Sequence, residues 1–137
     1  MSLRKPISWI LNFTANLPND KEKVLCLRAN EQPAVLTILR YCYDPAIKWL
    51  MPDGIPPYQP ARESNATMLY SEARRLYLFV EGGKPDLNQD RREQLFIELL
   101  QSVLPADAEL LLSIKDKKMP YEGLDADLVL QAFPGLW

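Results

Sequence analysis

Histidine is absent from the 137 residues, and this absence removes a frequent participant in enzyme chemistry. Imidazole is the commonest general base and the commonest metal ligand in proteins. The two cysteines, Cys26 and Cys42, are too few and too widely separated for a zinc site. Both lie among apolar residues, as small buried thiols in a reducing compartment do. We therefore expect no metal and no cofactor.

Long apolar runs are also missing, since no stretch approaches the roughly 18–20 residues that span a bilayer. The first residues, MSLRKPISWILNF, combine a basic pair with an apolar segment. Polar residues interrupt this segment, and no small-residue cleavage site follows, so the pattern is not that of a signal peptide. We expect a cytoplasmic protein that makes no membrane contact.

The sequence also lacks an excess of basic residues over acidic ones. The net charge is −2, from 16 Lys and Arg against 18 Asp and Glu. Proteins that bind nucleic acid on their own are usually basic, so any such binding must depend on local basic patches. The hydrophobic fraction of 47% is sufficient for one ordinary core, and the length suits a single domain over residues 1–137.

What the chain does contain is helical periodicity, interrupted by twelve prolines and five glycines. In the first half, helices are expected after Pro6, after the Asn19–Glu22 capping box, from Pro33 to about Tyr43, and from the Asp44-Pro45 cap to Leu50. Residues 52–63 carry four prolines and should form an irregular surface loop.

The second half continues the same pattern. Helices are expected from a Ser64 cap to about Val80, after an Asn88 cap, from Pro105, and after an Asp125 cap. The stretch LYLFV at 76–80 is locally strand-like, but its surroundings favour helix. The sequence thus predicts an all-α compact single domain of about eight short helices.

Catalytic groups are not apparent in the remaining motifs. The stretch MPDG at 51–54 has the Asp-Gly of a nucleotidyl-transfer motif, but Met51 replaces the lysine that would be adenylated. Carboxylates are plentiful, and several sit at or near predicted helix starts, where capping and the helix dipole favour them. They are Asp86, Asp90, Glu93, Asp107, Glu109, Glu122, Asp125 and Asp127. We expect a protein that is not an enzyme.

Basic residues form the candidate binding site. Lys115, Lys117 and Lys118 end one predicted helix and precede Gly123. They either complement the helix C-terminus as solvated charges, or bind phosphate beside the backbone amides of the last helix. Arg74-Arg75 is a further basic pair. Trp137, the last residue, either packs on the domain or anchors a partner protein.

The order of these features resembles the N-terminal DNA-binding domain of ATP-dependent DNA ligases, most closely the compact domain of T-even-type bacteriophage ligases. The resemblance covers nearly the whole chain. It rests on WILNF, KVLCLRAN, ILRYCYDPAIKW, ARRL and LLLSIKDKKMPYEGLDADLVLQAFPGLW, whose Phe133-Pro134-Gly135-Leu136 stands at the family's Trp-Pro-Gly-Leu.

The resemblance implies an all-helical module that grips duplex or nicked DNA through phosphates and the minor groove. Lys115, Lys117, Lys118 and Gly123 correspond to the family's basic helix end and glycine turn, and Arg74 and Arg75 to its basic pair. In the ligases Pro-Gly-Leu leads into the catalytic domain, so we expect a module without its enzyme. The alternative is an adaptor for host or phage replication or transcription proteins, favoured by Glu122, Asp125 and Asp127 around the turn.

Overall fold

Proline and side-chain caps set the starts of most helices. The computed structural model describes residues 4–63 and 66–137, and within these ranges it contains seven α-helices, one 3-10 helix and no strand. The helices are α1 (Ile7–Ala15), α2 (Asp20–Ala29), α3 (Pro33–Tyr43), α4 (Leu69–Glu72), the 3-10 helix η2 (Ala73–Phe79), α5 (Gln89–Ser102), α6 (Pro105–Lys115) and α7 (Ala126–Ala132). The all-α prediction is confirmed.

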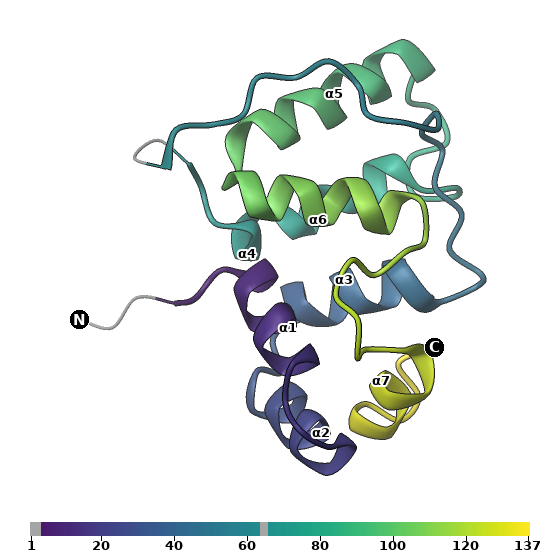
Figure 1. Cartoon of the computed structure of the whole chain (residues 1–137). Helices are drawn as coiled ribbons and strands as arrows, with labels where there is room; N and C mark the ends of the chain where they lie inside the picture. The colour runs from purple at the N-terminus through teal and green to yellow at the C-terminus, as the bar shows by residue number, and fades with distance from the viewer. Residues whose placement is uncertain (1–3, 64–65) are drawn as a thin grey trace.

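Helix α3 lies in the middle of the domain (Figure 1). It contacts α4, η2 and α6, while α5 packs on η2 and α6. Helix α1 contacts α6 and α2, and α2 in turn packs against α7. Arg28 of α2 donates hydrogen bonds to the carbonyls of Gln131 and Ala132, which are 103 and 104 residues later in the chain. The last helix, α7, therefore packs against the second helix, α2, although the two are far apart in sequence.

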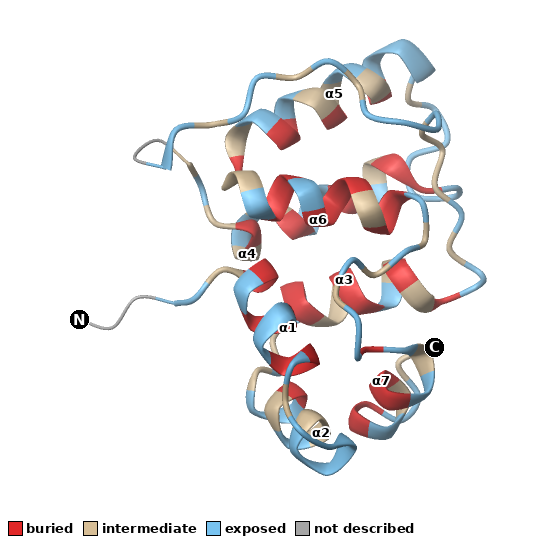
Figure 2. Cartoon of the chain, viewed as in Figure 1, coloured by how far each residue is buried: buried red, intermediate tan, exposed pale blue. Residues whose placement is uncertain are grey.

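The core is one continuous cluster, and the buried sides of the helices face it (Figure 2). Phe79 and Phe96 meet edge to face, with ring centroids 5.1 Å apart. Trp49, from the segment after α3, approaches Phe96 in the same manner at 6.3 Å. Residues 44–50, which belong to no helix, are thus held against the core by an aromatic ring.

The caps predicted at Asn19, Asn88 and Asp125 are confirmed. Asn19 Oδ1 accepts a hydrogen bond from Glu22 N at 2.9 Å, and Asp125 Oδ1 accepts one from Leu128 N at 2.8 Å. Asn88 caps α5 in the same way. Pro33 and Pro105 each stand in the first turn of a helix, where a missing N–H costs nothing. These starts depend on neighbours in sequence, which is why a sequence pattern finds them.

The predicted helix from Asp44 to Leu50 is wrong. Asp44 Oδ1 accepts from Ala46 N at 2.9 Å, so the side chain closes a local turn instead of a helical cap. Trp49 then forms an isolated antiparallel bridge with Val80. The carbonyls of Asp44 and Ile47 bond to a lysine from another part of the chain, and the segment stays irregular.

The long helix predicted from Ser64 to Val80 is only partly present. Ser64 lies outside the described residues. Thr67 N donates to Ser102 O at 2.7 Å, so this backbone is paired with the end of α5 and the helix begins only at Leu69. It continues as η2 and ends before Val80, which is extended. Among the described residues, no helix is long and apolar enough to cross a membrane.

The cap of α7 gives a stability prediction. Asp125→Ala should lower the free energy of unfolding by about 1 kcal/mol, because the amide of Leu128 loses its acceptor. Asp127→Ala is the matched control, since it removes the same charge from the first turn of α7 but no cap. The control should cost roughly 0.3–0.5 kcal/mol. Urea unfolding of both variants checks this, and equal losses would contradict the capping role.

Candidate nucleic-acid interface

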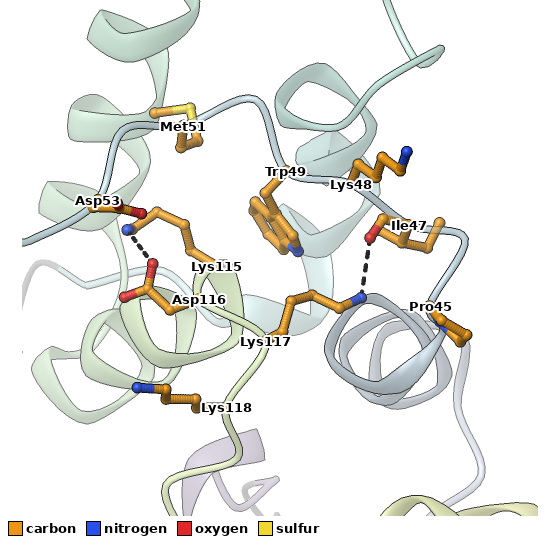
Figure 3. A pocket seen from close by; sticks show the side chains of 10 residues that line it. All are labelled: Pro45, Ile47, Lys48, Trp49, Met51, Asp53, Lys115, Asp116, Lys117 and Lys118. Atoms are coloured by element: carbon orange, nitrogen blue, oxygen red, sulfur yellow. Dashed lines mark hydrogen bonds and ion pairs between the residues drawn. The ribbon is translucent and has the colours of Figure 1, made fainter.

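An open groove lies where the end of α6 meets the segment after α3. Its volume is about 630 Å³, and Figure 3 shows the side chains that line it. They are Pro45, Ile47, Lys48, Trp49, Met51, Asp53, Lys115, Asp116, Lys117 and Lys118. We call this feature the lysine groove, because four lysines line it against two carboxylates.

Lys115 is the last residue of α6, and its side chain is buried. Its ammonium donates to Pro52 O at 3.0 Å and forms an ion pair with Asp116 Oδ1 at 2.8 Å. The first bond fastens the start of the proline-rich loop to α6. Lys115 thus holds the wall of the groove, with its charge partly balanced by Asp116.

Lys117 has a structural role that its position in the sequence does not reveal. Its ammonium donates to Tyr41 O at 3.0 Å, Asp44 O at 2.7 Å and Ile47 O at 3.1 Å. These bonds use all three N–H groups of the ammonium. Two of them satisfy carbonyls at and just beyond the end of α3, where a cation also complements the helix dipole.

The position of Lys117 has two physical consequences. Its backbone has φ 61°, so the chain turns sharply there and brings the side chain back over α3. Burial lowers the pKa of the ammonium, while the nearby acidic groups of Cys42 and Asp44 oppose this shift. Lys117 therefore contributes positive potential to the groove, but a phosphate could bond to it only by displacing a carbonyl.

Lys118 and Lys48 are the exposed cations of the groove. In Figure 3 their side chains extend on opposite sides of it, with the Trp49 indole between them. The indole N–H donates to Tyr41 O at 3.1 Å, which fixes the ring. The groove thus combines two exposed cations with two that are already bonded. The sequence pattern does not place Lys48 and Trp49 in this site, because only the tertiary structure brings them beside α6.

Gly123 does not line the groove. Its φ is +105°, and a Cβ there would lie 2.3 Å from Ala15 O, so the turn packs closely on the end of α1. Its carbonyl accepts from Lys23 Nζ at 2.9 Å. The nearby amide of Leu128 is already bound by the Asp125 carboxylate. The expected combination of the lysines with a phosphate cradle at Gly123 is therefore not assembled.

Arg74 and Arg75 are both exposed on η2, apart from the residues of the groove. Arg75 forms an ion pair with Glu72 at 3.2 Å. Trp137 stacks on Tyr43 of α3, with ring centroids 6.3 Å apart and planes 23° from parallel. It is only partly buried, yet it packs on the core, as the packing alternative expects.

Asp107 is a buried acid whose role is local. Pro6 precedes α1 and supplies no side-chain cap, and Asp107 Oδ1 from α6 instead accepts from Ser8 N at 3.0 Å. Its second oxygen, Oδ2, has no partner among the described residues. Burial raises the pKa of this carboxyl, and the hydrogen bonds from Ser8 oppose the shift. The observed contact is a helix cap made by a distant residue.

A comparison with models of protein families assigns the chain to one family. A model of DUF6433, a family of unknown function, matches residues 10–121. The chain belongs to this family. No curated protein and no solved structure matches it. The matched range contains the three lysines of α6 and the following turn, and it ends before Gly123 and Trp137.

The three bonds of Lys117 give a second prediction. Lys117→Met should lower the free energy of unfolding by about 1–3 kcal/mol, because three carbonyls lose a charged donor. Lys118→Met is the control, since Lys118 is exposed in the same groove and should change stability by less than about 0.5 kcal/mol. Urea unfolding compares the two variants, and similar losses would contradict the structural role of Lys117.

The pH dependence of stability tests Asp107. Because its folded-state pKa is raised above the ordinary value, the folded carboxyl resists ionisation. Its contribution is complete at pH values below the unfolded-state pKa and is lost as pH rises through the folded-state pKa. Asp107→Asn cannot ionise, so the stability of this variant relative to the parent should increase from about pH 3 to pH 7. Urea unfolding at several pH values measures this difference in the free energy of unfolding. A difference that decreases with rising pH would show that the fold stabilises the ionised carboxylate instead.

Proposed function

We propose that this chain is a non-catalytic helical module that binds duplex or nicked DNA through phosphate contacts in the lysine groove. The supporting observation is that four lysines from two distant segments line one open groove against two carboxylates. Phosphate contacts supply most of the sequence-independent affinity for DNA. The resemblance to the ligase DNA-binding domain supports the same function.

The lysines contribute in two ways. Lys48 and Lys118 are exposed and can reach phosphates directly. Lys115 and Lys117 stay bonded to carbonyls, yet their positive charges raise the potential of the groove. With two to four charges engaged, the log–log dependence of affinity on salt should have a slope of roughly −2 to −4.

The proposal is tested with nicked and intact duplexes at about 50 and 200 mM salt, the range in which phosphate contacts are sensitive. Fluorescence anisotropy measures the affinity. The double variant Lys48→Ala/Lys118→Ala should bind both duplexes more weakly and reduce the steepness of the salt dependence by roughly 2. The loss should be similar for all DNA sequences, because phosphate contacts carry no base information.

The matched control is Lys21→Ala/Lys84→Ala. These lysines are also exposed, and the control has the same net charge as the groove variant. It should bind nearly as the parent does. An equal loss in both double variants would show a diffuse charge effect, and absence of parent binding at low salt would overturn the proposal.

The second candidate is an adaptor for replication or transcription proteins. It is favoured by the fact that several cations bond to main-chain carbonyls and are not available to phosphates: Lys23, Arg28, Arg92, Lys115 and Lys117. Affinity capture from lysate with added nuclease separates the candidates. A partner that survives nuclease, with no affinity of the pure protein for DNA, would favour the adaptor.

A further inference from the structure

Two large aromatic side chains of α1 stack on each other and are exposed to solvent. Trp9 and Phe13 are one helical turn apart, their ring centroids are 5.1 Å apart and their planes differ by 11°. They are 46% and 48% exposed. The pair is therefore preformed and remains accessible, which suits it to a ligand with a flat apolar face.

Cations accompany these rings. Lys5 Nζ lies 4.8 Å from the centre of the Trp9 ring, and the Arg4 guanidinium lies 4.9 Å from that of Tyr70. The Tyr70 hydroxyl donates to Lys5 O at 2.8 Å and so holds the segment before α1 in place. We call Arg4, Lys5, Trp9, Phe13 and Tyr70 the aromatic face.

Two hollows adjoin the stacked pair, with volumes of about 200 and 320 Å³. Among the residues that the structure describes, no carboxylate lines either hollow. Carboxamides line both: Asn30 and Gln32 in the first, Asn12 and Asn16 in the second. Another hollow beside Trp9 differs, since Glu63 and Glu109 line it. The surroundings of the aromatic face thus favour an anionic ligand with hydrogen-bonding edges.

We propose that the aromatic face binds single-stranded nucleic acid by stacking an unpaired base on the Trp9–Phe13 pair. Arg4 and Lys5 contact the adjacent phosphates, and the carboxamides bond to base edges. Stacking on aromatic rings next to cations is how proteins hold single strands without sequence preference. A duplex cannot use this site, because its bases are stacked on one another. The site is separate from the lysine groove and goes beyond the proposed function.

A protein ligand is the competing occupant, since exposed tryptophans also anchor protein interfaces. The charges favour nucleic acid. Within the described part of the chain, Arg4 and Lys5 form no ion pair. They lie over rings and line one hollow, to which no described carboxylate contributes. A polyanion satisfies both cations at once.

The test uses a dye-labelled oligodeoxythymidylate of about twelve nucleotides, a length within the usual site sizes for single strands. Phe13→Ala should weaken binding at least about fivefold, the loss expected when one base no longer stacks. Phe13→Tyr keeps a ring and should bind as the parent does. Leu25→Ala is the control, because Leu25 is 55% exposed on α2 and lines neither hollow. Circular dichroism melts verify folding of each variant.

An intact duplex is titrated in parallel, so that this proposal and the lysine groove are judged separately. Phe13→Ala should leave duplex affinity unchanged, and Lys48→Ala/Lys118→Ala should reduce duplex affinity more than oligonucleotide affinity. Parent protein that binds duplex but not the oligonucleotide would overturn the aromatic face alone. Equal oligonucleotide binding by Phe13→Ala and parent would also overturn it. A further result would overturn the proposal: a benzophenone placed at position 13 cross-links to another protein after nuclease treatment, while the chain itself does not bind the oligonucleotide.

Discussion

The ammonium of Lys117 makes the contact on which the centre of the fold depends. Its three hydrogen bonds join the turn after α6 to the end of α3 and to the irregular segment that follows. Without this ammonium, Tyr41 O would keep the Trp49 indole N–H and Asp44 O would keep the Ile47 amide, but Ile47 O would lose its donor among the described residues. An unsatisfied buried carbonyl costs about 1–3 kcal/mol. The same bonds hold part of the irregular segment 44–50 in place, and Trp49 of this segment packs against Phe96 in the core.

Cations bonded to main-chain carbonyls recur through the domain. Arg28 on α2 donates to the carbonyls of Gln131 and Ala132 at the end of α7, and the buried Arg92 donates to those of Leu78 and Lys84. Helix ends leave carbonyls without intrahelical partners, and a domain of short helices has many such ends. Long basic side chains reach them across the fold and also complement the helix dipoles.

This structural use of cations limits what the surface can bind. Lys115 and Lys117 lie in the lysine groove but are already bonded, so direct contacts there fall to Lys48 and Lys118. At the aromatic face the cations lie over rings, and their side chains bond to no carbonyl of the described residues. The proposals for the two surfaces therefore differ physically. The groove acts mainly through charge, and the aromatic face acts through stacking with charge beside it.

The sequence by itself determined the helical class, the loop at 52–63 and the starts of α2, α3, α5, α6 and α7, because caps and prolines act on residues a few positions away. It also placed Lys115, Lys117 and Lys118 on one helix end. Only the tertiary structure decided that Lys117 bonds to α3, that Asp107 caps α1, and that Lys48 and Trp49 complete the groove. Each of these joins residues distant in sequence, and a long side chain finds its partner only after the helices have packed.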